Sequence, residues 1–175
     1  VIYLIIQVPV MILLALFISV MLNDKTMKLK GVFRTAIFLP CVTSLVAYSV
    51  IFKYLFGEQG IINIFLVKFS LISEPIHWLT DPFWAKIAII VAITWRWTGY
   101  NMIFYLSALQ NIDQSIYEAA KIDGASSFQT FFKITIPMLK PIILFTSITS
   151  TIGTLQLFDE VMNITQGGPG NATMT

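Results

Sequence analysis

Charged side chains are scarce in this sequence. Asp, Glu, Lys and Arg make up 11% of its 175 residues, whereas soluble domains contain about 25%. Hydrophobic residues account for 57%, and the mean hydropathy is +0.81. A water-soluble fold with so few charges could not cover its own surface, so the composition excludes an ordinary soluble domain.

Residues that carry catalytic or metal chemistry are equally rare. The single cysteine, Cys41, excludes a disulfide framework and a cysteine-based metal site. The only histidine is His77, and neither an H-E-x-x-H nor a Walker A pattern occurs. The net charge of +2 is too small to indicate nucleic-acid binding. We therefore expect no enzyme, no metal site and no bound cofactor, and no ATP hydrolysis by this chain itself.

What the sequence does contain is long hydrophobic runs. Crossing about 30 Å of hydrocarbon takes a helix of roughly 20 mainly apolar residues, because lipid offers no partners for free backbone amides. The runs lack the two-residue alternation of barrel strands, so they predict helices. The expected spans are residues 1–22, 35–56, 83–109 and 138–160. We predict one all-α domain over residues 1–175, a polytopic transmembrane helical bundle. Its hydrophobic start and loop-like end suggest a piece of a longer protein, incomplete at both ends.

The basic residues predict the orientation of the bundle. Seven of the 11 lie in two segments, residues 23–34 and 110–140, and they are Lys25, Lys28, Lys30, Arg34, Lys121, Lys133 and Lys140. The positive-inside rule places such segments in the cytoplasm. Residues 57–81 and 167–175 are then expected to face outward.

The predicted outer loop contains a short apolar run at residues 60–67. This run is too short to span a bilayer, so it predicts an interfacial helix. Trp78, Phe83 and Trp84 near the start of the next span are typical of an aromatic belt at the membrane surface.

The cytoplasmic segment 110–137 predicts two short helices joined at Gly124. Asp113 is suited to open the first helix and Gly124 to end it. Ser126 or Ser127 can cap the second, and Pro137 is expected to stop it. Small residues at Ala119, Ala120 and Gly124 would let another backbone approach closely. The alternative is an ordinary amphipathic loop between two spans.

One spacing in this segment is more specific. Glu118-Ala119-Ala120, three residues, Gly124, nine residues, Ile134, two residues and Pro137 resembles the EAA loop of binding-protein-dependent ABC importer permeases. The string from Glu118 to Ala125 is similar to the sugar-type branch, the family of the maltose and glycerol-phosphate permeases. Further stretches agree in order, and they are residues 33–40, 78–82, 106–112, 158–160 and 165–169.

The resemblance implies a type I ABC importer transmembrane domain in the bacterial inner membrane. It implies a second permease subunit, two ATP-binding subunits that use the ATP, and an extracytoplasmic solute-binding protein. It also implies that a coupling helix docks on the ATPase through Glu118, Ala119, Ala120, Asp123 and Gly124. The expected cargo is a sugar or oligosaccharide. The alternatives are a permease for another solute, such as glycerol phosphate or an oligopeptide-like compound, and a secondary transporter.

Polar and aromatic residues within the last two spans are candidates for contacts with the cargo, because polar groups inside a membrane are expensive and mostly functional. Aromatic faces stack on the C–H surface of a sugar, and amide or carboxylate groups bind its hydroxyls. The candidates are Trp95, Arg96, Gly99, Asn101, Gln156 and Asp159. Alternatively, Arg96 pairs with a carboxylate such as Asp159, and the tryptophans serve packing alone.

Overall fold

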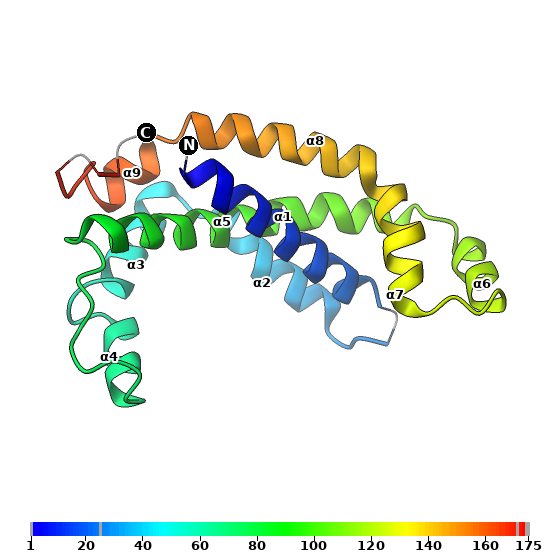
Figure 1. The fold of residues 1–175 in the computed structure, drawn as a ribbon, viewed down its shortest axis with the longest axis horizontal. Helices are drawn as coiled ribbons and strands as arrows, with labels where there is room; N and C mark the ends of the chain where they lie inside the picture. The colour runs from blue at the N-terminus through cyan, green and yellow to red at the C-terminus, as the bar shows by residue number, and fades with distance from the viewer. Residues whose placement is uncertain (1, 25, 171, 174–175) are drawn as a thin grey trace.

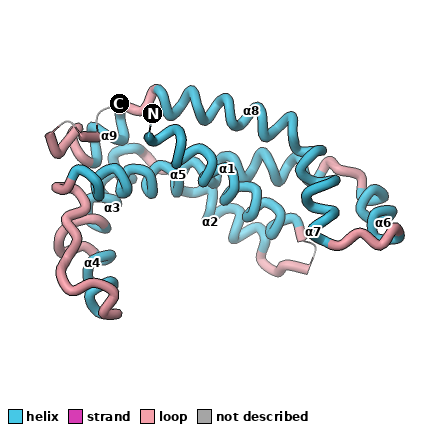
Figure 2. The backbone as a smooth tube through the Cα atoms, viewed as in Figure 1, coloured by secondary structure: helices cyan, strands magenta, loops and turns pink. Residues whose placement is uncertain are grey.

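The computed structural model describes residues 2–24, 26–170 and 172–173, and over these ranges the chain consists of helices joined by turns (Figures 1 and 2). This confirms the predicted all-α fold. Val1 of the first expected span, Lys25 of the basic loop, and Asn171, Met174 and Thr175 of the expected outer tail lie outside the described residues.

Among the residues that the structure describes, three helical stretches are long and apolar enough to cross a membrane. They are α1 (Ile2–Asn23), α5 (Pro82–Gln110) and Ser127–Leu155. Pro82 stands in the first turn of α5, where its missing N–H costs nothing, and the Asp81 carboxylate accepts hydrogen bonds from the amides of Phe83 and Trp84. Helix α5 lies between the other elements and contacts α1, α2 and α8, so it forms the centre of the bundle.

The second expected span, residues 35–56, is not one straight helix. It is broken into α2 (Lys30–Val42) and α3 (Leu45–Leu55), which meet at an angle of 101°. Thr43 is extended at the break, and the Ser44 hydroxyl accepts a hydrogen bond from the Ala47 amide to start α3. Thr43 and Ser44 lower the hydropathy over two residues only, so a prediction from long apolar runs does not find the break.

The helix in the region of the fourth expected span, residues 138–160, begins and ends earlier than the expected bounds. A continuous helical path runs from α7 (Ser127–Thr130) through the π-helical turn η1 (Phe131–Thr135) into α8 (Ile136–Leu155). Pro137 does not stop this path, because it falls in the first turn of α8, directly after the wider π turn. After Leu155 the chain turns into the short helix α9 (Asp159–Ile164), which was not expected.

Two short helices lie where the sequence predicts them. The expected interfacial helix is α4 (Ile61–Lys68), and the expected first cytoplasmic helix is α6 (Gln114–Ile122). Figure 1 shows α6 and α7 at the end of the bundle where α1 leads into α2, and α4 and α9 at the opposite end. The two basic segments therefore share one end of the molecule, as their charge predicted.

Three groups of buried apolar residues hold the helices together. Near the basic end, α1, α5 and α8 pack through residues such as Leu22, Tyr105 and Leu139. Near the other end, α3 packs on α5 through an aromatic group that includes Tyr48, Phe52, Phe56 and Trp78. The third group joins α1, α5 and α9 through Tyr3, Ile89, Ile93, Leu157 and Val161. These contacts bring α1, α5, α8 and α9 around one cavity.

Candidate functional site

A cavity of about 740 Å³ lies between α1, α5, α8 and the segment that leads into α9. Its volume falls in the range of 300–1,000 Å³ that is common for small-molecule sites. Its walls combine apolar, aromatic and polar side chains, including Gln7, Ile93, Arg96, Trp97, Tyr100, Ser150, Thr154, Gln156, Asp159 and Glu160. Such a lining suits a ligand that has both apolar and hydroxyl-rich surface.

The only cation among the lining residues is Arg96 of α5, and it faces a carboxylate. Its Nη1 lies 3.9 Å from Oε1 of Glu160 on α9, and both side chains are almost fully buried. The pair therefore neutralises two charges whose separate burial would be costly. However, Nε and Nη1 of Arg96 make no hydrogen bond to any residue that the structure describes. Both nitrogen atoms are also buried, so Arg96 contributes its positive charge to the cavity wall through other atoms of the guanidinium.

Aromatic rings surround the same guanidinium. The Cζ atom of Arg96 lies 5.1 Å from the ring centre of Tyr48 and 5.8 Å from that of Trp97. Trp97 meets Tyr100 edge to face, with 5.7 Å between the ring centres. These rings hold the cation by cation–π contacts, and Trp97 and Tyr100 also offer apolar surface to the cavity.

The opposite wall is fixed by hydrogen bonds between distant helices. The Thr154 hydroxyl of α8 donates to Oε1 of Gln7 on α1 at 2.9 Å. Asn101 of α5 is buried, and its amide donates to the Ser150 hydroxyl at 3.4 Å and contacts the Met11 sulfur at 3.3 Å. These bonds set the spacing of α1, α5 and α8 along the cavity.

The six candidate residues divide into two sets. Arg96, Gln156 and Asp159 line the cavity. Trp95, Gly99 and Asn101 are not among its lining residues. Trp95 lies against the aromatic group of α3, stacked 6.3 Å from Tyr48, and a side chain at Gly99 would collide with the α2 backbone. Arg96 pairs with Glu160 and not with Asp159, its expected alternative partner.

Sequence reasoning missed Glu160 and Gln7. Gln7 is a lone amide within an otherwise apolar run, and the cost of a polar group in the membrane would have marked it. Glu160 adjoins the candidate Asp159, and only the turn after Leu155 decides which of the two carboxylates points back at α5.

The second candidate site is the segment at the basic end. Asp113 caps α6 by accepting from the Ser115 amide at 2.9 Å, and this backbone hydrogen bond holds the pKa of its carboxyl below the usual range. Helix α6 ends before Gly124, which has φ +75°. Ser126 starts α7 with a capping box to Gln129. The predicted caps and the junction at Gly124 are therefore confirmed, but the second helix is not short, because it continues into α8.

The predicted coupling residues are not all exposed. Glu118, Ala119, Asp123 and Gly124 are exposed, whereas Ala120 is buried within the chain and has little surface to offer a partner. Large apolar side chains that the motif did not mark are exposed at the same end. Ile122 is 86% exposed and Phe128 is 71% exposed. The Tyr117 hydroxyl lies 3.3 Å from that of Thr135, which connects α6 to the π turn.

The family model of the binding-protein-dependent transport system inner membrane component matches residues 1–175. The chain belongs to this family. Members of the family are inner-membrane transport components. The chain is therefore a membrane transport component and not an enzyme, as expected.

Similar permeases extend further than this chain. The chain is 65% identical to the lactose transport system permease protein LacF of Rhizobium radiobacter, over 100% of this chain and 59% of that protein. It is 36% identical to the arabinooligosaccharides transport system permease protein AraP of Halalkalibacterium halodurans, over 99% of this chain and 55% of that protein. The chain thus spans a little over half the length of these relatives.

A solved structure shares the fold. A bacterial alginate ABC transporter, crystallised in complex with an alginate pentasaccharide-bound periplasmic protein, superposes with a TM-score of 0.81. The match covers 98% of this chain and 61% of that chain at 23% sequence identity. The bundle is therefore the transmembrane fold of ABC importers.

Proposed function

We propose that this chain is the membrane-spanning permease part of an ATP-driven importer for a sugar or an oligosaccharide. The observation that carries the proposal is the 65% identity to LacF along the whole chain. The cavity supports it, because Trp97 and Tyr100 offer aromatic surface while Arg96 and Gln156 offer donors for hydroxyl oxygens.

The transporter is assembled from several subunits under this proposal. A solute-binding protein delivers the cargo on the outer side, a second permease subunit completes the pathway, and two ATP-binding subunits supply the energy. This chain binds no cofactor of its own. Its exposed residues Glu118, Asp123 and Ile122, at the basic end, dock on an ATP-binding subunit.

Removing the polar groups of the cavity is expected to weaken transport. Gln156→Ala and Asp159→Ala each delete one set of possible hydrogen bonds to the cargo. A net hydrogen bond contributes about 0.5–1.5 kcal/mol, so each change should raise the half-saturating cargo concentration roughly 2- to 10-fold. Uptake of radiolabelled lactose into proteoliposomes, with the binding protein present, measures this effect.

Gln59→Ala and Glu74→Ala are the matched controls, because they remove the same groups from exposed positions outside the cavity. Basal ATP hydrolysis should stay the same in all four variants. Uptake curves for Gln156→Ala and Asp159→Ala that coincide with those of the controls would remove both residues from the pathway.

The sidedness of the bundle follows from its basic end. We expect position 121 on α6 to face the cytoplasm and position 74 to face outward. In a Cys41→Ser background, a membrane-impermeant maleimide should label Glu74→Cys in intact cells. It should label Lys121→Cys only after permeabilisation. Labelling of position 121 in intact cells contradicts this orientation.

A further inference from the structure

Helix α4 exposes an apolar stripe to its surroundings. Ile61, Ile64, Phe65 and Phe69 follow one another at helical spacing and are 67%, 58%, 56% and 59% exposed. The rings of Phe65 and Phe69 lie 4.4 Å apart, so the stripe forms one continuous surface. Lys68 is the only charged residue in the helix, and it stands on the same side. A contiguous apolar surface of this kind is unusual on a loop that is surrounded by water.

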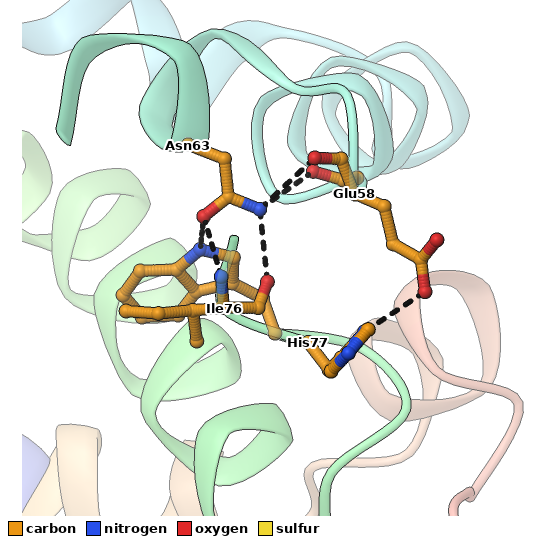
Figure 3. Close-up of polar contacts among 6 residues, drawn as sticks. Glu58, Asn63, Ile76 and His77 are labelled. Atoms are coloured by element: carbon orange, nitrogen blue, oxygen red, sulfur yellow. Dashed lines mark hydrogen bonds and ion pairs between the residues drawn. The ribbon is translucent and has the colours of Figure 1, made fainter. Parts of the chain in front are cut away.

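The buried side of α4 fixes which way this stripe points. Figure 3 shows Asn63 directed into the loop, where its amide nitrogen donates to the carbonyl of Ile76 at 2.9 Å and its amide oxygen accepts from the Ile76 amide at 3.1 Å. The same oxygen accepts from the Trp78 indole at 2.9 Å, and the nitrogen also donates to the Glu58 carbonyl at 3.1 Å.

These hydrogen bonds use both the amide nitrogen and the amide oxygen of Asn63, which is only 1% exposed. Turning α4 to hide Phe65 would break them inside the protein, where unsatisfied polar groups are costly. The contact between His77 and Glu58, 2.9 Å apart, adds a second connection across the same loop (Figure 3). The apolar stripe is therefore held outward by the fold.

The neighbours of α4 give its depth in the membrane. Ile62 and Leu66 pack on the aromatic group that contains Phe56, just after α3, and Trp84 in the first turn of α5. Helix α5 has 29 residues, which corresponds to a length of about 44 Å. The hydrocarbon layer is about 30 Å thick, so roughly one turn of α5 extends beyond it at each end. When α5 is centred in the hydrocarbon layer, its first turn and the adjoining α4 fall at the membrane surface. Helix α4 projects sideways from this end of the bundle (Figure 1).

From this we infer that α4 lies in the outer headgroup region of the bilayer, with Ile61, Ile64, Phe65 and Phe69 inserted among the lipid chains. An apolar helix face beside a membrane span buries itself at this boundary, and Lys68 can reach the lipid phosphates. The helix anchors the loop 57–81 to the membrane surface, and the Asn63 hydrogen bonds connect it to Ile76 and Trp78, just before α5. This inference does not depend on which solute is transported.

Quenching of a single fluorescent label tests the inference. In the Cys41→Ser background, bimane is attached at Phe65→Cys or at Ile61→Cys, and at Glu74→Cys as the control in the same loop. The permease is purified with the subunits that accompany it and placed in nanodiscs with or without shallowly brominated phospholipid. We expect brominated lipid to quench the labels at 65 and 61 at least twofold more than the label at 74. We expect aqueous iodide to show the opposite order.

Two results would overturn the inference. Strong iodide quenching at 65 and 61, without any effect of brominated lipid, would place α4 in water. Labels that escape both quenchers only after the solute-binding protein is added would identify the stripe as a protein-docking surface. Retained association with the accompanying subunits shows that a labelled variant is folded. Transport is not measured, so the inference can fail while the proposed function stands.

Discussion

Gly124→Leu and Glu118→Lys are each expected to release the ATP-binding subunit and abolish ATP-dependent uptake, while the permease still inserts into the membrane. At Gly124 the cause is the backbone: φ is +75°, a conformation that costs other L-residues roughly 1–2 kcal/mol. A Cβ at this position would meet no heavy atom of the described residues within 4 Å. The added side chain would therefore project into the space where the ATP-binding subunit is proposed to dock.

At Glu118 the cause is charge. The side chain is exposed in the isolated chain, so Glu118→Lys should leave the stability of the bundle unchanged. Truncating one partner of a buried interfacial charge pair costs about 2–5 kcal/mol, and a reversed charge adds repulsion. Affinity for the ATP-binding subunit should fall at least about 30-fold. Copurification of that subunit and ATP hydrolysis stimulated by the loaded binding protein measure the loss.

Matched controls separate docking from general damage. Gly31→Leu adds the same side chain in the first turn of α2, also where a Cβ meets nothing within 4 Å, and Glu74→Lys reverses an exposed charge in the loop between α4 and α5. Gly124→Asn should retain more activity than Gly124→Leu, because asparagine tolerates positive φ. A Glu118→Lys/Gly124→Leu double variant with normal ATP-binding-subunit binding and normal stimulated hydrolysis would reduce the segment to a linker.

Gly99→Ala is expected to destabilise the bundle itself. Helices α5 and α2 touch at this glycine, and an added Cβ would overlap the Ile37 carbonyl oxygen and lie 3.0 Å from the Cα of Phe38. The contacted atoms are backbone, so a side-chain rotation cannot relieve the clash. Overpacking of this kind costs about 1–3 kcal/mol, and Gly99→Val should prevent folding. Thermal unfolding of the purified protein in detergent measures the effect.

Gly153→Ala in α8 is the control for this change. It adds the same methyl group within a helix, but no described heavy atom lies within 4 Å of the new Cβ. Alanine is favoured over glycine in a helix by roughly 0.5–1 kcal/mol, so the melting temperature should stay the same or rise. Equal melting temperatures for Gly99→Ala and Gly153→Ala would mean that α2 and α5 are not tightly packed.

Local signals in the sequence predicted local structure well. Asp113, Gly124 and Ser126 act through neighbours within a few residues, so their roles as helix caps could be inferred from spacing alone. Three of the expected spans contain a helix of sufficient length, because burial in lipid selects for uninterrupted apolar runs. The family motif and these caps were enough to indicate an importer permease.

Features that depend on distant contacts could not be predicted. Gly99 was a candidate for the transport pathway, but its neighbour is the backbone at Ile37, more than 60 positions earlier in the chain. The choice of Glu160 over Asp159 as the partner of Arg96 depends on how the chain turns after Leu155. Neither contact can be predicted from the composition of the chain or from the spacing of its residues.

The π turn at Phe131–Thr135 has a consequence for the phase of α8. An α-helix rotates by about 100° per residue, and a π turn takes up one additional residue without ending the helix. Every position after Thr135 is therefore rotated relative to a helical wheel that is drawn straight through from Ser127. The stretch before the turn has its own exposed face, with Phe128 and Phe132, and the Tyr117–Thr135 contact lies at the turn itself. After the turn, the polar row Thr146, Ser150 and Thr154 faces Tyr105, Asn101 and Gln7. The π turn thus lets one continuous helical path present one surface to α1 and α5 and a differently oriented surface at the basic end of the bundle.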